Sequence, residues 1–422
     1  MINKNFTLLW LSKIISQLGD KFYAIALAWW ILQKTNSTST MGFFLLVSIL
    51  PGLLFGFFAG AMADRWRKKT ILIVTDIIRG CLVLIISYLS MAEALEIWHV
   101  FFIGFCLSIV TAFFDPASQA IIPEIVEKDN LIKANGRSQL VGGFCTVAGP
   151  LVGALAVSTF GLAWVFFANS VSYFLSFLLS CFIRIEKTSA NRDINKRKEQ
   201  NNSVVMKHNI SKDILEGIHF IKNKKSLVTV LTVIGIAHFF IGSLSVTLPF
   251  LANELKGRGV NNLGYLEMMI GIGLIAGTLF IGRKKKASLT ERTLTFFVMV
   301  LGLCFIAVSS LQYFEVKSVG FYLPIILVIG ASIGSASVLW QSMIQYNTPG
   351  HMTGRVYSVS TLVGNSSLPI AYGVFGVLLK FGSICIIMLG SGISLLVIYF
   401  YLAYRTSKQS LQNENECSID AN

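Results

Sequence analysis

The feature that most constrains this chain is its series of long, uncharged apolar stretches. Gly42–Met62 and Gly320–Leu339 are two of them, and neither contains a charged residue. An α-helix needs about 20 apolar residues to cross the hydrocarbon core of a bilayer, whereas a membrane β-strand alternates apolar and polar residues. Charged residues make up 13% of the chain, about half the share of a soluble protein. The chain is therefore predicted to be an all-α, multi-pass protein of the lipid bilayer.

Hydropathy along the chain predicts twelve spans in two groups of six. The spans lie near residues 6–32, 41–62, 70–91, 97–115, 138–159, 162–183, 226–251, 263–282, 293–313, 319–342, 355–379 and 382–404. They divide the chain into an amino-terminal six-helix bundle (1–184), a cytoplasmic linker (185–225), a carboxyl-terminal six-helix bundle (226–404) and a disordered cytoplasmic tail (405–422). Within the linker, the segment 213–222 has apolar residues at helical spacing, which is typical of an amphipathic helix at the bilayer surface.

The formal net charge of +14 comes from basic residues in short blocks between the apolar spans. Most of these blocks fall on one side of the predicted topology, which places both termini and the linker in the cytoplasm. Because there is no single basic domain, we expect no binding to nucleic acid. The seven cysteines lack C-x-x-C spacing, so we expect neither metal ligands nor a disulfide framework.

The two halves of the chain share an internal repeat. Gly136-Arg137 precedes Pro150 in the fifth span, and Gly354-Arg355 precedes Pro369 at nearly the same spacing in the eleventh. Parallel six-span repeats are a common transporter design. The repeat therefore favours a transporter that works by alternating access over a channel or a membrane enzyme.

Three motifs accompany the repeat. The loop after the second span reads Gly60-Ala-Met-Ala-Asp64-Arg65-Trp66-Arg67-Lys68-Lys69. The fifth span contains Gly149-Pro150-Leu-Val-Gly153-Ala154. The inner end of the fourth span reads Phe114-Asp115-Pro116-Ala117-Ser118-Gln119-Ala120.

The first two motifs resemble the loop motif and the antiporter motif of the major facilitator superfamily. The third stretch is similar to the third drug:proton antiporter family, which includes macrolide efflux proteins and the enterobactin exporter. The resemblance covers about residues 6–404. It implies the major facilitator fold, a bacterial cytoplasmic (inner) membrane location and proton-coupled export. The chain departs from the family pattern at Arg67, which replaces a glycine of the loop motif, and at Cys145 and Ala154, which replace the outer glycines of the antiporter motif. The fourth span also lacks the superfamily's usual arginine.

The resemblance also implies a conformational latch at the cytoplasmic side. Its residues would be Gly60, Asp64, Arg65, Arg67, Lys68 and Asp115. Asp64 would accept hydrogen bonds from the start of another helix, and the basic residues would pair with Asp115 until the cytoplasmic mouth opens. The alternative interpretation is that the basic residues only anchor the cytoplasmic side.

The antiporter motif predicts a bent span that seals against a neighbour. Pro150 lacks a backbone donor, and Gly149 and Gly153 permit close helix contact. In the family this motif implies a barrier to leak without substrate. The glycines at positions 52, 56, 60, 273 and 277 are interpreted instead as ordinary small-residue packing.

Asp20 is the first candidate for proton coupling. It lies about 21 Å along a helix from Phe6, near the bilayer midplane, and it shares a helical face with Lys13 and Gln17. An ionisable residue at this depth is a functional candidate by default. The alternative is a structural ion pair with Lys21 or with a basic residue on another helix.

Four of the other ionisable residues within the spans are also candidates. Asp76 and Arg79 are three residues apart on one helix, which predicts a buried ion pair. Glu267 and His238 are further proton-coupling candidates, with an interfacial carboxyl group and a packed histidine as the respective alternatives.

Aromatic and amide side chains indicate a cavity for an amphipathic substrate. The candidates are Gln17, Tyr23, Phe239, Trp340 and Gln341. The chain has no P-loop, no H-E-x-x-H and no nucleophile elbow, so we expect no enzyme activity and no cofactor. The chain is predicted to be a monomeric secondary transporter that exchanges protons for small amphipathic compounds such as macrolide-like antibiotics. Export of an endogenous metabolite such as a siderophore or peptide antibiotic, or lipid flipping, remains an alternative.

Overall fold

The computed structural model describes residues 3–127, 130–184, 216, 218–283 and 290–419. Its helices are α1 (Lys4–Thr35), α2 (Thr38–Arg65), α3 (Lys68–Met91), α4 (Ile97–Ala120), α5 (Ile122–Ile125), α6 (Leu131–Phe160), α7 (Leu162–Cys181), α10 (Lys225–Glu254), α11 (Gly259–Gly282), α12 (Glu291–Tyr313), α13 (Val319–Asn347), α14 (Gly350–Phe381) and α15 (Ile384–Ile419). No strand occurs in these described ranges. The all-α prediction is therefore confirmed for this part of the chain.

Eleven helices of the described part are long and apolar enough to cross a membrane. The remaining predicted span, residues 6–32, corresponds to α1, which has 32 residues. Its apolar sequence is interrupted by Lys13, Asp20 and Lys21. A span interrupted by charged residues is thus the one that carries the first proton-coupling candidate, Asp20.

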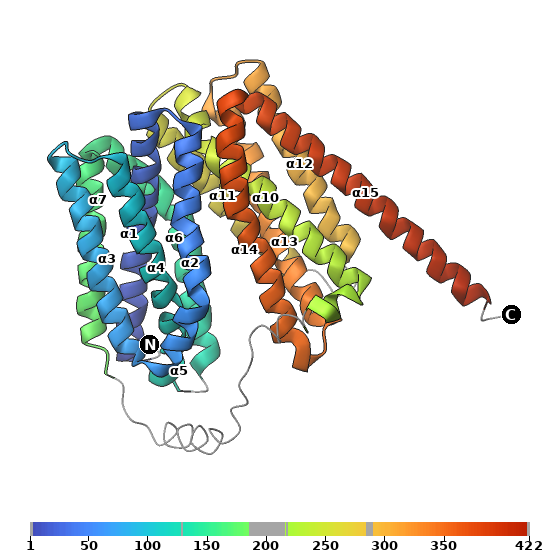
Figure 1. Cartoon of the computed structure of the whole chain (residues 1–422), viewed down its shortest axis with the longest axis horizontal. Helices are drawn as coiled ribbons and strands as arrows, with labels where there is room; N and C mark the ends of the chain where they lie inside the picture. Colours follow the sequence, from blue (N-terminus) through green and yellow to red (C-terminus); the bar gives the residue numbers. More distant parts are fainter. Residues whose placement is uncertain (1–2, 128–129, 185–215, 217, 284–289, 420–422) are drawn as a thin grey trace. The chain divides into compact units, whose positions relative to one another are not determined.

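The carboxyl-terminal end differs from the prediction of a disordered tail at 405–422. The last helix, α15, continues to Ile419, and Figure 1 shows it as one long helix that ends at the carboxyl terminus. Residues 405–419 contain neither proline nor glycine, so no residue in them breaks the helix. Most of the predicted linker lies outside the described residues, but residues 216 and 218–222 of its amphipathic segment are helical.

Contacts divide the chain into two compact units. Unit 1 comprises Met1–His208 with Val260–Met268, and unit 2 comprises Asn209–Gly259 with Met269–Asn422. In unit 1, α1 packs against α6 and α7, α3 packs against α4 and α7, and α2 packs against α4. In unit 2, α10 packs against α14 and α15, and α12 packs against α13 and α15. The helices of each unit can be followed by colour in Figure 1.

The repeat is visible in two matching helix ends. Glu93, after α3, and Glu315, after α12, both adopt a left-handed backbone conformation, with φ of 53° and 51°. The next residue in each loop donates a backbone hydrogen bond of 2.9 Å to the helix, Ala94 to Leu89 and Val316 to Leu311. This pattern is that of a Schellman-type helix end. The two glutamates are 222 positions apart (315 − 93).

Side-chain hydrogen bonds in the two units show the same separation in sequence. The Ser87 hydroxyl donates to the Ala163 carbonyl between α3 and α7, and the Ser309 hydroxyl donates to the Cys385 carbonyl between α12 and α15. Both donors and both acceptors are again 222 positions apart (309 − 87, 385 − 163). The helices α1 and α10 correspond with a separation of 221, the distance between their N-cap residues Asn3 and Lys224 (224 − 3). The residues of α1 and α3 therefore have identifiable counterparts in α10 and α12.

Candidate functional site

Helices α1, α3 and α7 of unit 1 bring charged side chains together inside their membrane-spanning segments. Asp76 and Arg79 of α3 form an ion pair, and their side chains are 0% and 2% exposed. The Ser176 hydroxyl of α7 donates a 2.7 Å hydrogen bond to the second carboxylate oxygen of Asp76. The carboxylate thus has partners on both oxygens, as a buried charge requires.

Asp20 of α1 has a different partner from the one considered in the sequence. The Tyr173 hydroxyl of α7 donates a hydrogen bond to its carboxylate, whereas Lys21 packs against Gly149 of α6. Asp20 is only partly buried. Its carboxylate is therefore held by a neutral hydroxyl and not by a direct ion pair.

Arg79 is the centre of this cluster. Its guanidinium lies 3.8 Å from the ring centroid of Phe114 and 4.7 Å from that of Tyr173, in cation–π geometry. Asp20, Asp76 and Asp115 all lie within electrostatic reach of it. One buried guanidinium therefore serves several carboxylates. We call this group the Arg79 cluster; it comprises Asp20, Asp76, Arg79, Tyr173 and Ser176.

The antiporter-motif residues lie where α6 meets α1. A side chain at Gly149 would collide with Lys21, and one at Gly153 would come within 2.9 Å of the Phe22 Cα. Pro150 lies inside α6 between them. These small residues therefore allow α6 to lie directly on the part of α1 that carries Asp20.

The structure describes the side chains of only some residues of the predicted latch. The side chains of Gly60, Asp64 and Arg65 lie outside the described residues, although α2 runs to Arg65. Lys68 differs from the prediction, because its amine pairs with Glu124 of α5 at 2.8 Å and not with Asp115. Asp115 is exposed and interacts with Arg79, Asp20 and Lys13. The reason is position, since α5 follows α4 directly and its acidic residue reaches the α3 start.

Arg67 is the N-cap residue of α3, and its exposed side chain makes no capping hydrogen bond.

In unit 2, helices α10, α12 and α13 line a partly open cavity of about 120 Å³. His238 and Trp340 are among the residues that line it. The His238 Nδ1 lies 2.9 Å from the Ile234 carbonyl one turn earlier, so this nitrogen is the donor in the neutral ring. Trp340 stacks on Tyr357 of α14, with ring centroids 5.8 Å apart.

The remaining candidates lie at separate places. Phe239 packs against Phe375 with ring centroids 5.1 Å apart, Gln341 is exposed, and Gln17 and Glu267 are partly buried on α1 and α11. The Tyr23 hydroxyl is buried, and its ring packs edge-on against Phe166 within unit 1. Tyr23 is therefore a packing residue of the bundle in this structure.

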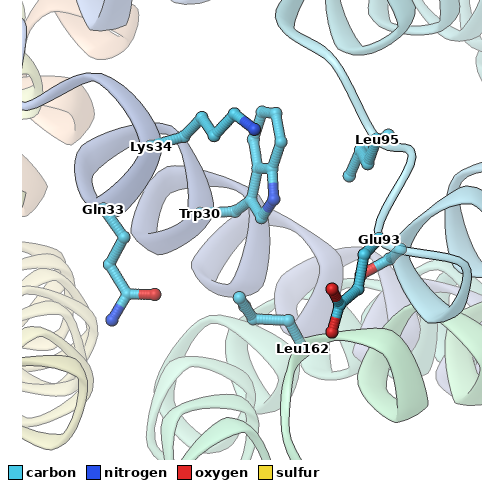
Figure 2. A pocket seen from close by; sticks show the side chains of 7 residues that line it. Trp30, Gln33, Lys34, Glu93, Leu95 and Leu162 are labelled. Atoms are coloured by element: carbon cyan, nitrogen blue, oxygen red, sulfur yellow. The ribbon is translucent and has the colours of Figure 1, made fainter.

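A second pocket, of about 340 Å³, lies at the end of unit 1 farthest along α1 from the amino terminus. Figure 2 shows Trp30, Gln33 and Lys34 of α1 around it, together with Glu93 and Leu95 of the α3–α4 loop and Leu162 of α7. A pocket of about 390 Å³ at Glu254, Gln312 and Glu315 of unit 2 involves the corresponding helix ends. Because both repeats form one, these pockets are features of the shared architecture.

Sequence reasoning missed the contribution of α7. Asn169, Ser172, Tyr173, Ser176 and Ser180 are all buried on this helix. They recur at three- and four-residue spacing, which is the signature of a single polar helix face. This stripe identifies α7 as the partner of the α1 and α3 charges. Among the described residues, no group of three or more His, Cys, Asp or Glu could hold a metal ion.

Comparison with known proteins agrees with this architecture. Residues 9–373 match the Major Facilitator Superfamily. Over 367 residues the chain is 22% identical to macrolide efflux protein A of Streptococcus pyogenes, covering 86% of this chain and 87% of that protein. Over 372 residues it is 23% identical to the multidrug efflux pump Tap of Mycolicibacterium fortuitum, covering 86% and 84%.

A solved structure shares the fold. A bacterial homologue of the iron transporter ferroportin, in its inward-facing state, superposes with a TM-score of 0.69 at 14% sequence identity. The match covers 95% of this chain and 99% of that one. The predicted major facilitator fold is therefore confirmed.

Proposed function

We propose that this chain, which belongs to the Major Facilitator Superfamily, exports amphipathic compounds such as macrolide-like antibiotics in exchange for protons. Membership makes it a multi-pass membrane transporter and not an enzyme. The relatives named for macrolide and multidrug efflux support the substrate class and the direction. Its operation as a monomer is part of the same proposal.

The Arg79 cluster is the observation that carries the proton coupling. Asp76 and Arg79 form a direct ion pair, whereas the direct hydrogen-bond partner of Asp20 is the neutral Tyr173 hydroxyl. An unpaired charge inside a membrane span is costly, and a proton removes that charge. Asp20 is therefore the group that exchanges a proton during the transport cycle. Glu267 and His238 are reserve candidates for the same role.

Proton exchange at Asp20 can reach other helices through its neighbours. Tyr173 joins Asp20 to α7, and α7 also holds Asp76 through Ser176. The contact of Gly149 with Lys21 places α6 beside the next residue of α1. A change of charge at Asp20 thus alters contacts along both faces at which α1 packs. Such a charge change at a packed helix interface is a known means of switching between two arrangements.

The cytoplasmic latch is part of this proposal. Asp64, Arg65 and Arg67 would hold the cytoplasmic side closed, and the Lys68–Glu124 pair would tie the start of α3 to α5. The proposal also places the chain in the bacterial inner membrane with both termini in the cytoplasm, because basic residues are concentrated in the loops of that side.

Transport by purified protein in proteoliposomes tests the proposed function. With an imposed pH gradient, labelled erythromycin should accumulate against its concentration gradient, and collapse of the pH gradient should abolish the accumulation. Accumulation that ignores the pH gradient would contradict proton coupling. Absence of erythromycin transport together with transport of a siderophore or peptide antibiotic would replace the drug by an endogenous metabolite.

A further inference from the structure

The cavity of unit 2 lies at positions that correspond to Asp20, Asp76 and Arg79 of the Arg79 cluster and to three neighbouring polar residues of unit 1. The residues Lys13, Gln17, Asp20, Asp76, Arg79 and Asp115 correspond to Ile234, His238, Ile241, Val298, Leu301 and Ser337. All six counterparts line the cavity of about 120 Å³ between α10, α12 and α13. The charged positions of unit 1 have thus become an apolar cavity in unit 2.

The cavity exists because two large side chains have small counterparts. In unit 1 the Arg79 guanidinium lies over the Phe114 ring and fills the space between α3 and α4. Their counterparts in unit 2 are Leu301 and Ala336. Replacement of a guanidinium and a phenyl ring by an isobutyl and a methyl group leaves unfilled volume between the same helices.

Most side chains that line the cavity are apolar, and the serine hydroxyl groups in the lining already have hydrogen-bond acceptors. The hydroxyls of Ser332 and Ser337 donate to carbonyls of their own helix, at 2.9 Å in each case. His238 uses its Nδ1 for the Ile234 carbonyl, so Nε2 of the neutral ring is an acceptor. An apolar cavity of about 150 Å³ in another protein stays dry and binds benzene. A space of this size therefore suits a single aromatic ring or a branched alkyl group.

We propose that this cavity is the subsite that receives an apolar ring or branched alkyl group of the exported compound, with a hydroxyl or ammonium donor of that compound beside His238. This inference rests on the proposed export function. The two repeats then have different roles, because unit 1 carries the charged residues and unit 2 uses the corresponding space to bind the apolar part of the substrate.

Filling the cavity tests the proposal. Ala336→Phe restores the ring that unit 1 carries at the corresponding position, and it should weaken binding of labelled erythromycin to the purified protein about tenfold, the effect of losing burial of one apolar group. Val328→Phe adds similar bulk on the same helix at an exposed position, and its affinity should match the wild type. Wild-type affinity in a normally folded Ala336→Phe variant would overturn the proposal.

A thiol measurement decides the case if Ala336→Phe does not fold, and it does not require erythromycin transport. Ser337→Cys is made in a chain whose seven native cysteines are replaced by alanine. The rate of modification by each reagent is divided by the rate at which that reagent modifies free cysteine. On this scale, benzyl methanethiosulfonate should modify the thiol of the Ser337→Cys variant about tenfold faster than the sulfonatoethyl reagent, because the apolar lining excludes the charged sulfonate. Erythromycin should protect the thiol.

The outcomes separate the two proposals. Equal normalised rates for the two reagents would overturn the cavity subsite. Protection by palmitoyl lysophosphatidylcholine without protection by erythromycin would assign the cavity to a lipid chain, and would likewise overturn it. A preference for the benzyl reagent in a protein that neither binds nor transports erythromycin would support the subsite while the macrolide form of the proposed function fails.

Discussion

The two units are built from corresponding helices but differ sharply in what those helices bury. Unit 1 encloses an ion pair, a hydrogen-bonded carboxylate and a guanidinium on aromatic rings. At the same register, unit 2 has a partly open apolar cavity with one histidine. The helix ends and the Ser87 and Ser309 bonds are nonetheless the same. Duplication has therefore kept the backbone frame and changed the side chains inside it.

The difference has a physical rationale. Buried charges are costly in a bilayer and must be paired or titrated, so a transporter gains little from two copies of a charge cluster. One copy can respond to protons while the other becomes a space for hydrocarbon. The following substitutions exchange residues between the repeats, or compare matched positions in them, to test this division.

The largest effect is expected from Arg79→Leu, which gives unit 1 the residue that unit 2 has at Leu301. The Asp76 carboxylate would then be buried without its guanidinium, and loss of one partner of a buried ion pair costs about 3–5 kcal/mol. Thermal unfolding in detergent should shift strongly downward, and transport should be lost. Wild-type stability would mean that the ion pair is not a structural element of unit 1.

The double variant Asp76→Val with Arg79→Leu separates charge from packing. It copies Val298 and Leu301, so neither charge is left unpaired. Replacement of a buried ion pair by apolar residues is often neutral or stabilising, and the double variant should therefore unfold close to the wild-type temperature. Uphill transport should still fail. Proton-driven export by this stable variant would show that coupling does not need the Asp76–Arg79 pair.

The next effect concerns Asp20, whose counterpart Ile241 is apolar. Asp20→Asn keeps the side-chain shape and removes the titration, so uphill export should fall at least about tenfold. Erythromycin binding should survive and lose its dependence on pH. The readout is binding and efflux on the same folded variant. Intact proton-driven efflux would exclude Asp20 as the carrier and direct attention to Glu267 or His238.

Tyr173→Phe provides the matched control for Asp20. It leaves the carboxyl group in place and removes only the hydroxyl that donates to it. Export should weaken without being abolished, because the titratable group remains. A loss of export as large as that in Asp20→Asn would show that the carboxyl group depends fully on this hydroxyl, because phenylalanine keeps the ring over Arg79.

Periodicity and composition were sufficient to predict the fold, because a membrane span must satisfy its backbone bonds internally. They also predicted the spacing that pairs Asp76 with Arg79, since both lie on one helix. They were not sufficient for Tyr173 or for Glu124, whose partners lie on other helices and depend on how α7 and α5 pack. The cavity of unit 2 was also beyond sequence reasoning, since it results from what Leu301 and Ala336 leave unfilled.

A smaller effect is expected at matched glycines. Gly56 of α2 and Gly277 of α11 correspond with a separation of 221 (277 − 56). A side chain at Gly277 would collide with the Ala331 backbone of α13, whereas one at Gly56 would meet nothing within 4 Å. Gly277→Ala should therefore cost about 1–3 kcal/mol by overpacking, whereas Gly56→Ala should stabilise the protein by about 0.5–1 kcal/mol through the higher helix propensity of alanine. Equal shifts in the unfolding temperature would contradict closer packing of α11 on α13.

The smallest effect should be equal in the two repeats. Glu93 and Glu315 hold the left-handed conformation that glycine adopts without steric cost. Glycine at these positions removes the backbone strain, which stabilises the folded state. It also raises the conformational entropy of the unfolded chain, which offsets part of that stabilisation. Glu93→Gly and Glu315→Gly should each stabilise the protein by about 0.5–1 kcal/mol. Glu96→Gly, at a residue with φ of −112°, is the control and should bring no gain. Because the two loops make the same backbone bonds, the two glycine variants should raise the unfolding temperature alike. Unequal responses would show that the repeats diverge in their helix ends as well as in their interiors.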